Sequence, residues 1–155
     1  MKEKLVVLKK MWNWSNGYIA TESEIKSFET TNDLVIPKDL SDYFKLINGT
    51  KGYDEGFFQF YPLSQFKSVE YFFAKWKTIL NYEIFRKTFG TDKSCFVFAD
   101  YQIHLFSYVI QLYPQKTDKN EIYIFCGEEY KLIAESFDEF VDLCIQDSPK
   151  LFFND

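Results

Sequence analysis

Residues 25–50 decide the fold and read IKSFETTNDLVIPKDLSDYFKLINGT. Just upstream, Thr21 and Glu24 have the spacing of a capping box, in which each side chain bonds to the backbone of the other residue. This pattern predicts a short helix that begins directly after Thr21 and ends between residues 30 and 33. Two apolar residues share the face of this helix that we expect to be buried, Ile25 and Phe28.

A second helix is predicted within the same stretch. Pro37 suits the first turn of a helix because its ring fixes φ near the helical value. Asn48 and Gly49 tolerate the left-handed conformation in which helices often end. We therefore expect a helix over about residues 38–47, joined to the first by an extended segment. Its apolar residues recur at spacings of three and four and share one face: Leu40, Tyr43, Phe44 and Ile47.

Two more helices are predicted on either side of this region. Residues 3–12 place apolar side chains and lysines on opposite sides of a helix, which indicates an amphipathic element. Ser64 can cap a long helix, and residues 81–89 either continue it or follow a break before Gly90. The long helix carries an apolar stripe that we expect to lie flat on a sheet: Phe66, Val69, Phe73, Trp76 and Leu80.

The last predicted helix begins at a second capping box, formed by Ser136 and Glu139, and runs to about residue 146. Its inward residues are Phe137, Phe140, Val141, Leu143 and Cys144. Its other face carries an acidic stripe that is typical of a solvated helix surface: Glu135, Asp138, Glu139 and Asp142.

Most of the remaining chain is predicted as strands, over residues 57–61, 94–99, 103–112, 121–126 and 130–134. Short turns separate the last four, which implies an antiparallel meander. The strand over 103–112 is apolar on both faces, so it is expected near the centre. The expected fold class is α+β, a single domain over 1–155. It has a mainly antiparallel sheet of about five to six strands packed with about four to five helices.

Aromatic residues dominate the composition. The chain has 155 residues, of which 18 are Phe, 11 are Tyr and 3 are Trp. Each ring can bury about 150–250 Å² of surface, so these residues supply much of the driving force for folding. They form either a bulky core or, in part, an exposed patch for a partner, because Tyr and Trp are favoured as interface anchors.

Charge and targeting signals narrow the class of protein. The formal net charge is −5, which disfavours direct binding of nucleic acid and suits a basic protein partner. The apolar run over residues 5–8 is too short for a signal peptide or a membrane span, so we expect a cytoplasmic protein without a membrane partner. The cysteines lie in apolar runs and are expected to be buried, reduced thiols: Cys95, Cys126 and Cys144.

The sequence offers few groups for catalysis. His104 is the only histidine, which excludes a two-histidine metal site within one chain, and it is expected inside a strand. No glycine-rich phosphate loop occurs. Carboxylate pairs at residues 54–55 and 128–129 are typical of solvated turns. We therefore expect no enzyme activity, no catalytic residue, no bound metal and no cofactor.

The chain resembles the SUKH superfamily, which is named in part for a yeast cell-wall synthesis regulator and is rich in bacterial immunity proteins. Three segments carry the resemblance: the two helices with their Ile36-Pro37 step and Asn48-Gly49 end, the strand ending Phe98-Ala99-Asp100, and the helix entry over residues 134–140. Ile36 stands where Leu is usual, and Thr50 where a second Gly is common. These motifs mark structural positions, so they argue for fold more strongly than for function.

The resemblance implies a cytoplasmic immunity protein that binds and neutralises a cognate toxin domain, often a nuclease, by occlusion. The toxin is expected to be encoded nearby, and the protein is expected to act as a monomer. Loops and strand ends are where binding residues usually lie. On that ground we expect the partner-binding residues to be Trp14, Tyr18, Tyr53, Asp54, Glu55, Asp100, Tyr101, Glu128 and Glu129.

Two other functions stay open from the sequence. One is a regulatory or scaffold module that binds other proteins without a toxin partner. The other is an enzyme or small-ligand binder that uses a pocket between the sheet and the long aromatic helix, which requires a deep cavity with convergent polar groups.

Overall fold

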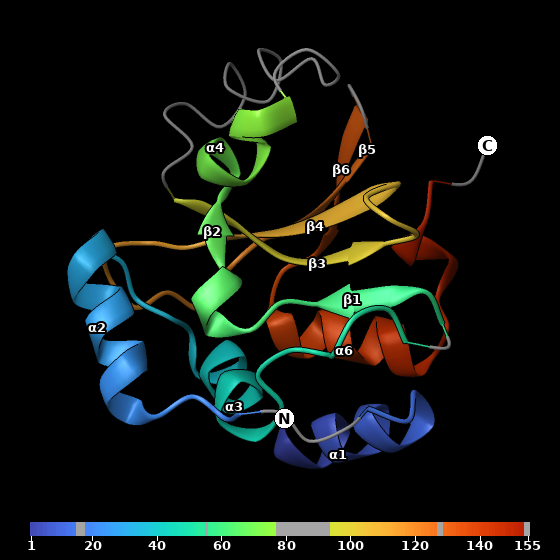
Figure 1. Ribbon diagram of the computed structural model, residues 1–155, viewed down its shortest axis with the longest axis horizontal. Coiled ribbons are helices and arrows are strands. Elements are labelled where there is room, and N and C mark those ends of the chain that lie inside the picture. The colour runs from blue at the N-terminus through green and yellow to red at the C-terminus, as the bar shows by residue number, and fades with distance from the viewer. Residues whose placement is uncertain (15–17, 55, 77–93, 127–128, 154–155) are drawn as a thin grey trace.

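The computed structural model describes residues 1–14, 18–54, 56–76, 94–126 and 129–153. These residues form five α-helices and a six-stranded antiparallel sheet, the predicted α+β arrangement in one domain. The helices α1 (Lys2–Met11), α3 (Lys38–Leu46) and α6 (Phe137–Ile145) pack together on one side of the sheet (Figure 1). The short helix α4 (Val69–Phe72) lies on the other side.

The helix boundaries predicted from residues 25–50 are confirmed. Helix α2 (Glu22–Asn32) begins at the Thr21–Glu24 capping box, in which both reciprocal hydrogen bonds are formed. Helix α3 begins directly after Pro37. Beyond its end, Asn48 and Gly49 adopt left-handed backbone angles, with φ of 53° and 93°. The local capping signals therefore fix these helices.

The sheet has the order β1-β3-β4-β5-β6, with β2 (Lys67–Ser68) also pairing with β3. The bounds of the others are β1 Phe58–Phe60, β3 Cys95–Tyr101, β4 Phe106–Gln111, β5 Ile122–Cys126 and β6 Glu129–Ala134. Every pair in the sheet is antiparallel, which confirms the meander, and β4 holds the expected central position.

The aromatic residues fill a core on each face of the sheet. The larger core lies between the sheet and α1, α3 and α6, and includes Tyr43, Phe98 and Phe140, all fully buried. The smaller core lies beneath α4 and includes Val97 and Val109. From Cys95 to Phe98, alternate residues of β3 enter opposite cores because side chains of a strand point to opposite faces.

The predicted long helix starting at Ser64 is wrong over the residues that the structure describes. In its place are a 3-10 turn (Leu63–Gln65), strand β2, helix α4 with Ser68 as its cap, and a second 3-10 turn (Phe73–Trp76). The backbone of β2 pairs with β3, and this tertiary pairing overrides the helical spacing. The predictions for residues 81–89 and Gly90 fall outside the described residues.

Two members of the acidic stripe of α6, Asp138 and Asp142, pair with positive charges of α1 and the amino terminus. The ammonium group of Lys4 contacts Asp138 at 2.5 Å and Asp142 at 2.7 Å. The amino terminus lies 3.5 Å from Asp138. This half of the stripe is therefore partly covered by α1, whereas Glu135 is 52% exposed, as expected of a solvated face, and pairs with Lys119.

Candidate functional site

Three connections of the chain meet at one end of the sheet. In the strand register, Phe58 pairs with Tyr101, Tyr101 with Phe106, and Cys126 with Glu129. The segment before β1, the β3–β4 turn and the start of β6 therefore share this end (Figure 1). We call it the loop end and define it as residues 53–54, 56–58, 101–106 and Glu129. The opposite end carries the β4–β5 connection.

A buried carboxylate, that of Asp100, lies beneath the loop end. Its residue has 0% exposure, and Oδ2 accepts a hydrogen bond from the hydroxyl of Tyr61 and lies 3.1 Å from Nδ1 of His104. Oδ1 has no hydrogen-bond partner among the described residues. Burial, followed by the hydrogen bond and charge of Asp100, raises the pKa of both Tyr61 and Tyr53, so both hydroxyls stay protonated and can donate to the carboxylate.

A β-bulge in β3 places this carboxylate. The register of β3 against β4 shifts between Val97 and Ala99, so that Phe98 is an extra residue. The shift turns Asp100 toward the α4 side of the sheet, where Tyr61 belongs to the smaller core. A strand without the bulge would direct Asp100 into the larger core, because alternate side chains point to opposite faces.

The β3–β4 turn above Asp100 has an unusual backbone. Gln102, Ile103 and His104 all have positive φ, at 47°, 54° and 65°. The sequence prediction of a strand over 103–112, with His104 inside it, is therefore wrong at its start, and β4 begins at Phe106. The hydrogen bond from the N–H of Leu105 to the carbonyl oxygen of Gln102, 3.3 Å long, closes the turn.

Apolar side chains project from the loop end. Ile103 is 79% exposed and Phe57 is 56% exposed, while Leu105 is also exposed. The carbonyl oxygen of Phe57 accepts a 3.0 Å hydrogen bond from the N–H of Gln102, so the two segments are held together. Single exposed apolar residues are ordinary, whereas a group of them at one place marks an interaction site.

Trp14 is not the exposed ring that the sequence predicted. It is 7% exposed and packs against Trp12 and Phe60. Its indole N–H donates to Asp54 at 2.8 Å, and the other oxygen of Asp54 accepts from the N–H of Phe58 at 2.9 Å. Because the carboxylate satisfies the indole, this ring can enter the core, and Asp54 is a structural residue as well as a surface one.

The other predicted partner-binding residues fall into separate places. Tyr53 and Glu129 are exposed at the loop end, and Tyr101 is half-buried there, stacked on Phe106. Tyr18 lies elsewhere, bonded to Glu24 at the start of α2. Asp100 is at the loop end but fully buried, contrary to the expectation of a surface contact. Glu55 and Glu128 lie outside the described residues. The sequence did not single out Phe57, Ile103 or Leu105, because exposure of an apolar residue leaves no local signal.

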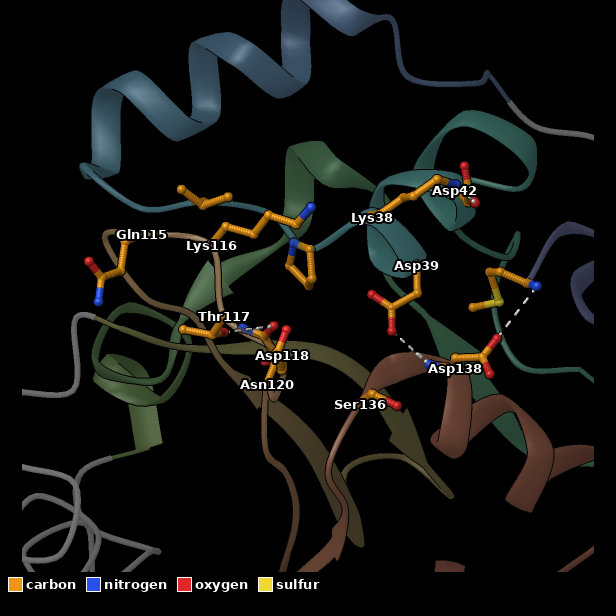
Figure 2. A pocket seen from close by; sticks show the side chains of 13 residues that line it. Lys38, Asp39, Asp42, Gln115, Lys116, Thr117, Asp118, Asn120, Ser136 and Asp138 are labelled. Carbon is orange, nitrogen blue, oxygen red and sulfur yellow. Dashed lines mark hydrogen bonds and ion pairs between the residues drawn. The ribbon is translucent and has the colours of Figure 1, made fainter.

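A second feature is a cavity of about 350 Å³ between α3, the β4–β5 connection and the start of α6 (Figure 2). Its polar groups are largely engaged with one another: Asp39 accepts from the N–H of Asp138 at 2.9 Å, and Lys38 pairs with Asp42 at 2.9 Å. Lys116 and Asp118 line the facing wall. The cavity has a ligand-sized volume. However, the polar groups of Asp39, Lys38 and Asp42 are already bonded within its wall and are not directed at its centre.

The remaining candidate chemistry is limited in the part of the chain that the structure describes. No three side chains of His, Cys, Asp or Glu gather there in a way that could hold a metal ion. Cys95 and Cys144 are buried as predicted, whereas Cys126 is half-buried. Burial raises the pKa of Cys126 and Cys144, which keeps both as protonated thiols of low reactivity. Among the described residues, no helix is both long and apolar enough to cross a membrane.

The structure defines a single α+β domain with an antiparallel sheet and a group of exposed apolar residues at the loop end. Comparison with known families matches residues 19–143 to the SMI1 / KNR4 family (SUKH-1), and the chain belongs to this family. The match begins just before α2 and ends within α6, so it spans the whole sheet. No curated protein matches the chain.

Proposed function

We propose that this protein is an immunity protein that binds a cognate toxin domain and neutralises it by occlusion, without a reaction of its own. Membership of the SUKH-1 family is consistent with this role. The observation that carries the proposal is the loop end, where Phe57, Ile103 and Leu105 are exposed at the same end of the sheet as the acidic Glu129. Apolar anchors with a charged rim are the usual anatomy of a protein interface.

The proposed partner is a basic toxin domain, encoded beside this protein and met in the cytoplasm by a monomer. The net charge of −5 favours such a partner because opposite charges speed diffusional encounter. Occlusion requires only that the loop end cover the toxin's active site or hold an inactive conformation. The acidic residues Glu55 and Glu128 belong to the same proposed surface by their position in the sequence.

Co-expression with the neighbouring gene is the direct test. We expect the neighbour to stop growth of the host and this protein to restore it, with the two proteins co-purifying. Toxicity that this protein does not relieve contradicts the proposal. A stable complex with a neighbour that is not toxic favours instead a regulatory or scaffold module.

Charge reversal locates the interface. Glu129→Lys is expected to slow association with the toxin and to weaken its dependence on salt, because it removes attraction at the rim. Asp118→Lys is the matched control, since it changes the net charge equally at the opposite end of the sheet, where Asp118 is exposed. Equal effects of the two variants would show that only the overall charge matters, and would exclude the loop end as the contact.

A further inference from the structure

The β3–β4 turn contains three consecutive non-glycine residues in the left-handed region, Gln102, Ile103 and His104. Left-handed angles are unfavourable for residues with a Cβ and most unfavourable for β-branched ones such as Ile103. Asn or Gly would adopt this conformation with less strain. Strain of this kind persists where surrounding contacts impose it, and it gathers at functional sites.

The contacts that impose this conformation involve the carboxylate of Asp100. His104 Nδ1 lies 3.1 Å from its carboxylate, which fixes the last residue of the left-handed run. Tyr53 provides a second connection: its hydroxyl lies near enough to Asp100 and to the backbone of Ile103 and His104 for all three to affect its pKa. Tyr53 and His104 therefore link the turn to Asp100 from two different segments of the chain.

Burying a carboxylate at residue 100 lowers the stability of the folded state. Asp100 is fully buried, and its Oδ1 has no hydrogen-bond partner among the described residues. A buried polar atom without a partner destabilises the folded state, and an apolar residue of similar size would avoid that cost. Filling space therefore does not explain a carboxylate at residue 100. Its contact with His104, a residue of the turn, gives it a role in holding the turn's conformation.

We propose that Ile103 is the apolar anchor of the toxin interface and that Asp100 is its positioning residue. This inference rests on the proposed function and adds the kind of surface that the partner presents: a preformed apolar pocket with a basic rim. Ile103 is 79% exposed on a turn fixed in advance, so its binding requires little further ordering. The basic rim is matched to Glu129, which is exposed at the same end of the sheet.

Ile103→Asn tests the anchor, because Asn removes the apolar side chain yet tolerates the left-handed angle. We expect its Kd for the toxin encoded beside this gene to rise about 30-fold or more, with no fall in the melting temperature. Val6→Asn is the matched control, since Val6 is β-branched and 56% exposed on α1. Its Kd is expected to stay within about twofold of wild type.

Asp100→Asn and Tyr53→Phe test the positioning role. Each is expected to weaken toxin binding by about tenfold and to speed amide hydrogen exchange over residues 102–105. Tyr53→Phe is the safer variant for folding, because Tyr53 is exposed. If positioning acts through Ile103, adding Tyr53→Phe to Ile103→Asn should weaken binding no further. Fully additive losses, or unchanged exchange in the turn, would refute the positioning role.

The outcomes separate this inference from the proposed function. If the wild-type protein binds the toxin and Ile103→Asn binds equally well, the anchor is wrong and the immunity function stands. If the wild-type protein binds no neighbouring toxin, the immunity function fails and the anchor fails with it. A loss of binding that Val6→Asn reproduces would also overturn the anchor, because the effect would then be nonspecific.

Discussion

Gly49 gives the sharpest test of how the decisive stretch holds the fold. It has φ of 93° and follows α3, and a Cβ built on it would lie 2.7 Å from the backbone nitrogen of Pro62 and 2.8 Å from the Cδ of Pro62. The preceding residue ties the same region together, because Oδ1 of Asn48 accepts from the N–H of Leu63 at 2.8 Å. A side chain at residue 49 therefore forces apart two segments that are bonded to each other.

The expected cost of Gly49→Ala has two parts. The left-handed angle costs an L-residue about 1–2 kcal/mol. Contacts under 3 Å with backbone cannot be relieved by a rotamer change, and forced overpacking of this kind costs about 1–3 kcal/mol more. The sum is about 2–5 kcal/mol, a large part of the roughly 5–15 kcal/mol by which a domain of this type is stable.

Gly52→Ala is the matched control. Gly52 has a φ of 96°, almost the same angle, but a Cβ built on it meets nothing within 4 Å. This variant should lose only the conformational part, about 1–2 kcal/mol. Urea unfolding followed by circular dichroism measures both values, and their difference isolates the clash with Pro62. Equal losses in the two variants would refute the reasoning, because the close approach would then have no energetic effect.

Three further predictions concern the core, a helix cap and an ion pair. Phe98→Ala should destabilise the protein by about 3–5 kcal/mol in the same unfolding assay, because Phe98 is fully buried against Phe137 and Phe140, and a cavity would remain. Thr21→Ala should cost about 1 kcal/mol through loss of the capping box, with a smaller change contradicting a role of the cap in stability. Burial acts to raise the pKa of Asp138, but the hydrogen bond and charge of Lys4 and the charge of the amino terminus outweigh it and leave this pKa below its usual value. Asp138→Asn should therefore lower stability slightly at pH 7. The difference from wild type should shrink as the pH falls from about 4, where this carboxyl group takes up a proton in the unfolded chain, through its lower pKa in the folded protein. A constant difference would contradict the pair.

Local signals in the sequence located the helices around the decisive stretch. The Thr21–Glu24 capping box, Pro37 and Asn48-Gly49 act within a few residues, so their effect does not depend on the rest of the fold. The stripe from Phe66 to Leu80 misled the prediction, because residues 67–68 gain more from pairing with β3 than from continuing a helix. Such a gain depends on a strand almost thirty residues further along the chain, which no local pattern reveals.

The sequence also indicated which loops belong to the candidate site, but not how their residues lie. Tyr53, Tyr101 and Glu129 lie at the same end of the sheet, because the antiparallel meander brings alternate connections to one end. The burial of Trp14 depends on the distant carboxylate of Asp54, and the face of the sheet on which Asp100 lies depends on a bulge at Phe98. Neither partner is apparent from the residues beside it.

The amino-acid sequence by itself determined the α+β class, the ends of the helices α2 and α3, the meander and the aromatic core, since these follow from backbone preferences and from spacing along the chain. Only the tertiary structure decided which side chains reach the surface. That outcome depends on hydrogen bonds between distant segments and on a one-residue shift in strand register, which exchanges the two faces of a strand. The strained turn that displays Ile103 is the clearest case, because distant contacts impose a conformation that its own residues disfavour.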